Sequence, residues 1–226
     1  MTQLGSFKTG AVALLLVCVV FTLGGCNIIA PIGGLVDSYR RQSTHGVPEE
    51  YRGLTGKRFA VLIVVDRIIQ GDHPDIVPYL TTKITERLVN EQQQIGATGV
   101  IPADRLLNYL YDHPRWLSMP RGQLAKELGV ERLVVVEVIE YRLTEPGNQY
   151  LWDGVATGTL GVIEADTALS DEFAFEKSVR VTFPDKQGYG PSDMSREEVT
   201  TALALRFLDR VTWPFYNHQE PYYPKY

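Results

Sequence analysis

The sequence predicts an α+β domain built on one mixed sheet with helices packed on it. Three observations indicate this class. An apolar, β-branched run at 58–65 is too short for a helix and suits a central strand. Two alternating segments between 152 and 183 follow each other without a helix between them, which favours antiparallel pairing. A capping-box pattern at Ser195 and Glu198 then starts a final helix, so the predicted order is β-α-β-α-α-β-β-β-α.

The first strand and helix follow directly from residue type and spacing. The run RFAVLIVV at 58–65 is nearly all apolar, as in strands that are buried on both faces. Asp72 can cap the following helix, with Pro74 near its first turn. Apolar residues then recur every four positions and predict one buried stripe: Ile76, Leu80, Ile84 and Leu88.

The middle of the chain predicts a short strand, two helices and a long strand. Residues 97–101 form the short strand, and Pro102 opens a helix with three inward-facing leucines. The next helix spans about 119–128 and stops at Gly129, as expected of a glycine just past a C-terminus. Residues 133–143 form the long strand, which is apolar at first and alternates later.

The last two strands show which faces are buried. In the second, Phe173, Phe175, Val179, Val181 and Phe183 alternate with polar residues, so one face is buried. In the strand before it, which begins near residue 152, Gly154, Ala156 and Gly158 share a face with larger apolar residues. Small residues there predict that a helix approaches the sheet closely.

The N-terminal 25 residues predict a lipoprotein signal peptide. Lys8 precedes an apolar core at 11–22, which is shorter than the roughly 20 residues that span a bilayer. The sequence Leu23-Gly24-Gly25-Cys26 follows it and resembles the bacterial lipobox, in which the cysteine carries the lipid. The alternatives are an uncleaved anchor and an ordinary signal with a chance cysteine. Lipidation of Cys26 with palmitate-type chains would hold the protein on a cell or outer membrane, with its domain in the periplasm.

The remaining chain divides into three predicted parts. Residues 26–56 are the lipidated cysteine and a tether rich in glycine, proline and polar residues. Residues 57–212 form a single α+β interaction domain, and residues 213–226 an aromatic, proline-rich tail. The tail either folds back as a lid or binds a partner. The candidate partner-binding residues are Trp213, Phe215, Tyr216, Tyr222 and Tyr223.

The composition argues against several classes of function. The formal net charge is −5, and removal of Lys8 with the signal makes it more negative, which argues against nucleic acid as a partner. Removal of Cys18 leaves Cys26 as the one cysteine, so neither a disulfide nor a cysteine metal site is expected. We expect no cofactor.

Three segments carry a resemblance to a known family. They are Ala60-Val61-Leu62, the run GQLAKELGVERLVVVEVIEY at 122–141, and GVIEAD at 161–166. Together they resemble the domain shared by the N-terminal part of TolB, by CsgG and by several envelope lipoproteins. The resemblance covers about residues 57–212 and implies a periplasmic interaction module. The turn after Asp166 lacks the family's usual Thr-Gly step, and no strands for a curli-type pore are present.

The sequence holds none of the nucleophile-elbow, phosphate-loop or zinc-helix motifs, and we expect a protein that is not an enzyme. The alternative is a metal-dependent enzyme that uses Asp66, Asp72, His73 and Asp75 in the 66–75 loop, although a capped helix start on a polar loop is the simpler interpretation of these residues. Glu137 and Glu140 are three residues apart on a strand and are expected on opposite faces. The charges at 127–132 and 196–198 are interpreted as solvated.

The leading hypothesis is therefore a membrane-anchored, non-enzymatic lipoprotein that binds or assembles an envelope protein. Its membrane contact is the N-terminal lipid, and its protein partner is not identified by the sequence. The second hypothesis is an oligomeric component of a secretion or export apparatus, so a homo-oligomer is a possible form. An exposed edge strand and the aromatic tail are the surfaces expected to bind.

Overall fold

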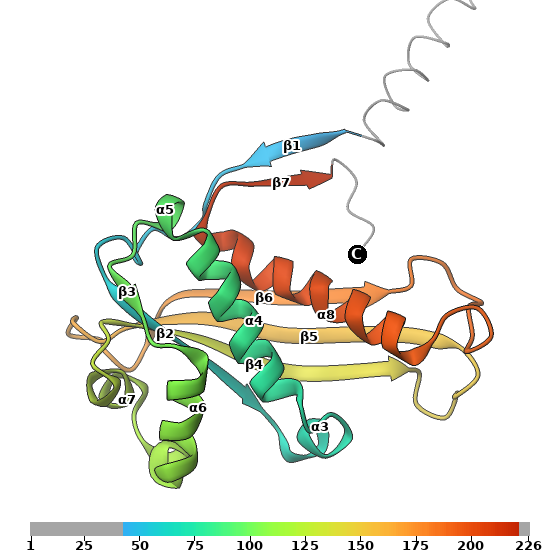
Figure 1. Ribbon diagram of the computed structural model, residues 1–226, viewed down its shortest axis with the longest axis horizontal. Helices are drawn as coiled ribbons and strands as arrows, with labels where there is room; N and C mark the ends of the chain where they lie inside the picture. Colours follow the sequence, from blue (N-terminus) through green and yellow to red (C-terminus); the bar gives the residue numbers. More distant parts are fainter. Residues whose placement is uncertain (1–42, 222–226) are drawn as a thin grey trace, which may run out of the picture. The chain divides into compact units, whose positions relative to one another are not determined.

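The computed structural model describes residues 43–221, and the larger of its two compact units spans Gly46–His218 (Figure 1). Outside that unit, the described residues are 43–45 and 219–221. The short strands β1 (Thr44–Val47) and β7 (His218–Pro221) form a two-stranded sheet. The predicted signal peptide, the predicted lipidation site Cys26, most of the predicted tether and the last five residues lie outside the described part of the chain.

The centre of the larger unit is a mixed five-stranded sheet with the order β3-β2-β4-β5-β6. β2 pairs in parallel with β3 and β4, whereas β5 is antiparallel to both β4 and β6. This confirms the predicted fold class. The strands are β2 (Arg58–Val65), β3 (Gly99–Val100), β4 (Arg132–Thr144), β5 (Trp152–Glu164) and β6 (Phe173–Phe183).

The helices follow the predicted order, with short additions. They are α3 (Arg67–Asp72), α4 (Ile76–Asn90), α5 (Gln92–Ile95), α6 (Ala103–Asp112), α7 (Arg121–Leu128) and α8 (Arg196–Thr212), with 3₁₀ turns at Pro114–Ser118 and Trp213–Phe215. The sequence pattern did not predict α3, and it indicated Asp72 as the cap of the following helix. Asp66 instead caps α3 by accepting a hydrogen bond from the Ile69 N–H at 2.8 Å. The chain then turns at His73, and α4 starts three residues later.

Hydrophobic clusters lie on both faces of the sheet. α4 and α8 pack on one face, together with β2 residues such as Val61 and Ile63 (Figure 1). α6 and α7 pack on the other face, where the intervening residues Ala60 and Leu62 contribute. β2 is therefore buried on both sides, as the apolar run predicts.

Small residues on β5 let α8 approach the sheet, as expected. A Cβ atom added to Gly154 would lie 3.4 Å from Leu203 Cδ2. A Cβ atom added to Gly158 would lie 3.1 Å from Phe207 Cζ and 2.6 Å from the Glu137 carbonyl oxygen. The absence of a side chain at Gly158 therefore sets the distance between α8 and the sheet.

We expect Gly158→Ala to lower the free energy of unfolding by about 1–3 kcal/mol, because its methyl group overpacks this contact. Gly71→Ala is the control, since Gly71 lies on α3 with no atom within 4 Å of its added Cβ. Urea unfolding of both variants measures the difference. Equal midpoints for Gly158→Ala and the unchanged protein would contradict the close approach.

Two irregularities in the strands change which residues share a face. A register shift lies between Val138 and Glu140, and Ile139 is 63% exposed there. Glu137 is opposite Thr159 and Glu140 opposite Thr157, two residues apart on β5. The expectation that these glutamates point to opposite faces is therefore wrong, because the extra residue restores them to one face.

A second shift, between Val162 and Ile163, affects the phenylalanines of β6. Phe175 packs with the α4–α8 cluster, but Phe173 packs with the α6–α7 cluster. The predicted single apolar face of β6 therefore ends at Phe175.

Arg132 joins the motifs on which the family resemblance rests. It is only 6% exposed, so the interpretation of residues 127–132 as solvated charge is wrong at this position. Its guanidinium donates to the Gly53 carbonyl oxygen at 2.8 Å and pairs with Asp166, and it lies 3.6 Å from Glu164. The buried arginine thus ties the first residue of β4 to the end of β5 and to the chain before β2.

The core extends into the predicted tether. Leu54 is 1% exposed within the α4–α8 cluster, and Tyr51 packs against that cluster. The Tyr51 hydroxyl donates to Glu164 at 2.8 Å. Burial, followed by this hydrogen bond, raises the pKa of Tyr51. The packed chain therefore begins before residue 57.

Candidate functional site

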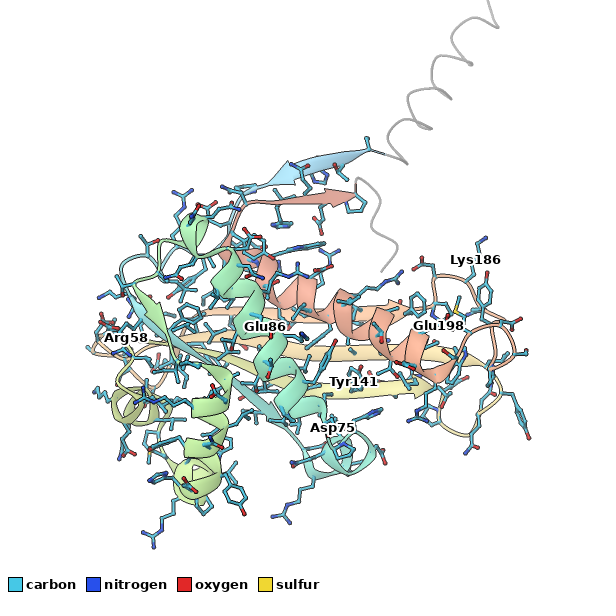
Figure 2. All side chains as sticks on the ribbon, in the orientation of Figure 1. Arg58, Asp75, Glu86, Tyr141, Lys186 and Glu198 are labelled. Carbon is cyan, nitrogen blue, oxygen red and sulfur yellow. The ribbon has the colours of Figure 1, made fainter. Side chains whose placement is uncertain are left out.

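A cavity of about 350 Å³ lies between the turn before α4, the strand β4 and the start of α8. Small-molecule sites commonly fall between about 300 and 1,000 Å³, so this cavity is at the small end of that range. Its apolar floor is formed by Ile76, Leu80 and Ala204. Figure 2 labels Asp75, Tyr141 and Glu198, which mark the three elements around it.

His73 forms one wall of the cavity. Its ring packs edge-on against Tyr141, with the ring centroids 4.8 Å apart and the planes at 81°. Burial lowers the pKa of His73, and the Arg196 guanidinium lowers it further. The lowered pKa favours the neutral imidazole, which can both donate and accept a hydrogen bond.

Tyr141 lies beside His73 and is 8% exposed. Burial raises the pKa of its phenol to about 12. The hydroxyl therefore stays protonated at neutral pH and keeps a proton that it can donate in a hydrogen bond. An unusually high phenol pKa excludes its use as a base near pH 7.

The opposite wall comes from the first turns of α8. Ser195 and Glu198 form the capping box that the sequence predicts, and this fixes the first turn. Arg196 and Thr200 line the cavity, and the Thr200 hydroxyl donates to the Arg196 carbonyl oxygen at 2.7 Å. Because that proton is already used within the helix, Thr200 is not poised as a nucleophile.

The electrostatics of the cavity are mixed. Asp72, Asp75 and Arg196 line the cavity together with apolar side chains. Such a surface suits a ligand that combines apolar area with hydrogen-bonding groups, for example an amino-acid side chain of another protein. The lining of the cavity includes tyrosine and arginine, which are residue types enriched at the energetic centres of protein interfaces.

The structure does not gather the four residues of the alternative metal site. Asp72, His73 and Asp75 line the cavity, but the Asp66 carboxylate caps α3. Within residues 43–221, no three His, Cys, Asp or Glu side chains are placed to hold a metal ion. The 66–75 loop therefore offers capping and cavity-lining groups, which was the simpler interpretation of its sequence.

The described part of the tail packs on the domain. Phe215 and Tyr216 are 2% and 5% exposed, and the Tyr216 hydroxyl lies 3.1 Å from Thr212 Oγ1. Trp213 is partly buried and stacks on His218, with centroids 4.6 Å apart. Tyr222 and Tyr223 lie outside the described residues, so partner binding by the tail stays a prediction.

Half of the residues that line this cavity were not predicted from the sequence. Tyr141 was placed on a strand without a role, and Arg196 was interpreted as solvated charge. The signal for Arg196 was its position directly after an N-cap serine, which places it in a first helical turn. Nothing local indicated that this turn would face the loop at His73, more than 100 residues away.

The solved structures compared with this chain below match it with TM-scores of 0.45 or less. No protein-family model and no curated protein matches the chain. A PelC dodecamer from Paraburkholderia phytofirmans is 12% identical, with a TM-score of 0.45, over 77% of this chain and 96% of that one. Lipoprotein GNA1162 from Neisseria meningitidis is 8% identical, with a TM-score of 0.40, over 66% and 92% of the two chains.

The hypothetical protein CT253 from Chlamydia trachomatis is 12% identical, with a TM-score of 0.42, over 70% of this chain and 93% of that one. Scores at this level assign no family, so the resemblance to the TolB and CsgG domain stays a prediction. Among residues 43–221, no helix has the length and apolar character needed to cross a bilayer.

Proposed function

We propose that this protein is a lipid-anchored lipoprotein of the bacterial envelope whose α+β domain binds another envelope protein without catalysing a reaction. The observation that carries the proposal is Leu23-Gly24-Gly25-Cys26 directly after a short apolar core. A lipidated Cys26 would confine the domain to a membrane surface. Two or more acyl chains hold a protein stably, because each buried CH₂ contributes about 0.8 kcal/mol.

The cavity between α4 and α8 supports the binding part of the proposal. It presents tyrosine and arginine side chains around an apolar floor, and Tyr79 at its edge is 39% exposed. Thr200 has its proton engaged within α8, and Tyr141 is held protonated. This chemistry favours recognition of a partner's side chain over turnover of a substrate.

Cys26→Ser in the full chain tests the anchor. We expect the protein to lose incorporated palmitate and to move from the membrane fraction to the buffer-soluble fraction. Cys18→Ser is the matched control, because Cys18 lies in the predicted signal peptide, and it should change neither result. Unchanged palmitate labelling of Cys26→Ser would reject lipidation at this residue.

Photocrosslinking in cells tests the partner-binding surface in the same proposal. A photoreactive aromatic residue at Tyr79 is expected to capture one defined envelope protein, identified by mass spectrometry. The same residue at Tyr111, which is 87% exposed on α6, is the control for nonspecific capture. Capture that is lost in Arg196→Ala supports the cavity as the site, and equal capture from both positions argues against it.

A further inference from the structure

β6 is an edge strand whose outer side is not paired with another strand of the described chain. It spans eleven residues, and in the sheet order its neighbour is β5 alone. An edge of this length presents a row of backbone N–H and C=O groups that another strand can pair with. Figure 1 shows β6 running along β5 beneath α8.

Two contacts show which backbone groups of β6 face outwards. The Thr182 carbonyl oxygen accepts a hydrogen bond from Arg206 Nη1 at 2.6 Å, so it points away from β5 and is occupied by this α8 side chain. The Phe183 carbonyl oxygen instead lies 2.6 Å from the Cβ position of Gly154 on β5. Because backbone groups alternate along a strand, those of Glu176, Ser178 and Arg180 point outwards with Thr182.

The sequence of this edge is complementary to itself. In an antiparallel pair of two copies centred on Ser178, Glu176 of each copy lies opposite Arg180 of the other. The same register puts Phe175 opposite Val181, and these extend the apolar row on the face that α8 covers. Phe175 is only partly buried in the single chain, so a second copy would cover more of it.

Neighbouring registers lack this complementarity. Centring the pair on Glu176 or on Arg180 sets like charges opposite each other, and centring it on Lys177 opposes two lysines. Centring on Val179 gives no pair of opposite charges. Like charges directly across a ladder destabilise it, whereas opposite charges stabilise it.

The side chains at the edge are available for such pairs. Glu176 is exposed and has no ion-pair partner among residues 43–221. Arg180 is exposed, and its contact with Glu140 is a long one at 3.4 Å. Its other contact, with Thr157 Oγ1 on β5, is also long at 3.3 Å.

From these observations we propose that two copies of the chain pair through β6 in antiparallel register, with Ser178 on the twofold axis. The two sheets then join into one. The contact is isologous, so it closes with two chains and leaves no second β6 edge exposed. This inference does not depend on the lipid anchor or on the cavity.

Disulfide trapping in cells that produce the full chain tests the pairing and its register. In the proposed register the two Ser178 Cα atoms are about 5.5 Å apart, which is within the range that a disulfide spans. Ser178→Cys is therefore expected to give a reducible dimer after brief treatment with the permeant oxidant diamide. Glu176→Cys should give little dimer, since its two copies are about 13 Å apart along the strands.

Charge-reversal variants distinguish specific β6 pairing from disulfides that form when two chains collide at random. In the Ser178→Cys background, Glu176→Arg puts arginines opposite each other twice and should reduce the trapped dimer about fivefold. Adding Arg180→Glu restores both opposite-charge pairs and should restore the dimer. Glu145→Arg, at an exposed residue of the β4–β5 connection, is the matched control and should have no effect.

Three outcomes would overturn the proposal. The first is no more dimer from Ser178→Cys than from Glu197→Cys, an exposed position on α8, or from the chain with its natural cysteines. The second is trapping that is unaffected by Glu176→Arg, and the third is a crosslink to a different protein in place of the dimer.

Discussion

Replacing Arg132 by methionine is expected to lower the free energy of unfolding by about 3 kcal/mol at pH 7. The guanidinium is buried and binds Asp166, the Gly53 carbonyl oxygen and the Glu131 carbonyl oxygen. Its removal takes a hydrogen-bond donor away from each of these oxygen atoms, and water has little access to replace it. The loss of unfolding free energy should lie near the lower end of the range that is usual for removing one partner of a buried ion pair. The reason is that the side chains of Glu164 and Asp166 are 22% and 34% exposed, so water can partly solvate them.

The dependence of this loss on pH identifies its cause. Hydrogen bonds from Lys57 and then Arg132 hold the pKa of Asp166 at about 2, below its ordinary value of 3.8. A lowered folded-state pKa stabilises the protein fully above about pH 4, and this contribution disappears as the pH falls through about 2. The stability difference between the natural protein and Arg132→Met should therefore shrink between pH 4 and pH 2.

Urea unfolding followed by circular dichroism at several pH values measures both effects. Arg115→Met, at an exposed arginine of the 3₁₀ turn after α6, is the control and should change stability by less than about 0.5 kcal/mol. A loss that stays constant down to pH 2 would show that Arg132 acts through packing and not through Asp166.

Phe207→Ala is expected to destabilise the domain by about 3–5 kcal/mol. Phe207 is fully buried on α8 and contacts the space above Gly158, where a side chain is absent. Truncation leaves a cavity next to Gly158, and β5 cannot fill this cavity because glycine has no side chain. The large loss therefore follows from the same fit that makes Gly158→Ala overpacked.

Leu205→Ala on the same helix is the matched control for this prediction. Leu205 is 45% exposed, so its loss should cost much less than that of Phe207. Thermal and urea unfolding of the two variants give the comparison. Equal losses would mean that α8 does not pack through Phe207 on β5.

Much of the fold can be predicted from the sequence because its signals are local. The apolar run of β2, the stripe of α4 and the capping box of α8 each depend on residues within a few positions of one another. The glycines of β5 also predicted the close approach of a helix correctly. Even so, Asp66 and not Asp72 turned out to be a capping aspartate, because several aspartates in one loop are equally suited to cap a helix.

Only half of the candidate site could be predicted from the sequence, for a physical reason. His73 and Asp75 drew attention as polar residues in a loop, but Tyr141 and Arg196 join them only through the packing of β4 and α8. Similarly, Glu137 and Glu140 share a face because β4 carries an extra residue opposite β5. The position of such a bulge depends on the partner strand and leaves no clear mark on its own strand.

The sequence by itself determined the class of fold, the order of its central elements and the prediction of a lipid anchor at Cys26, because periodicity, caps and a cleavage motif are short-range patterns. Only the tertiary structure decided that Arg132 is buried, that β6 is an edge and that a cavity opens between α4 and α8. These features join segments far apart in the chain, such as Arg132 and Gly53, which are 79 residues apart. Burial and pairing at that separation depend on how the whole chain packs, and local residue patterns carry little information about it.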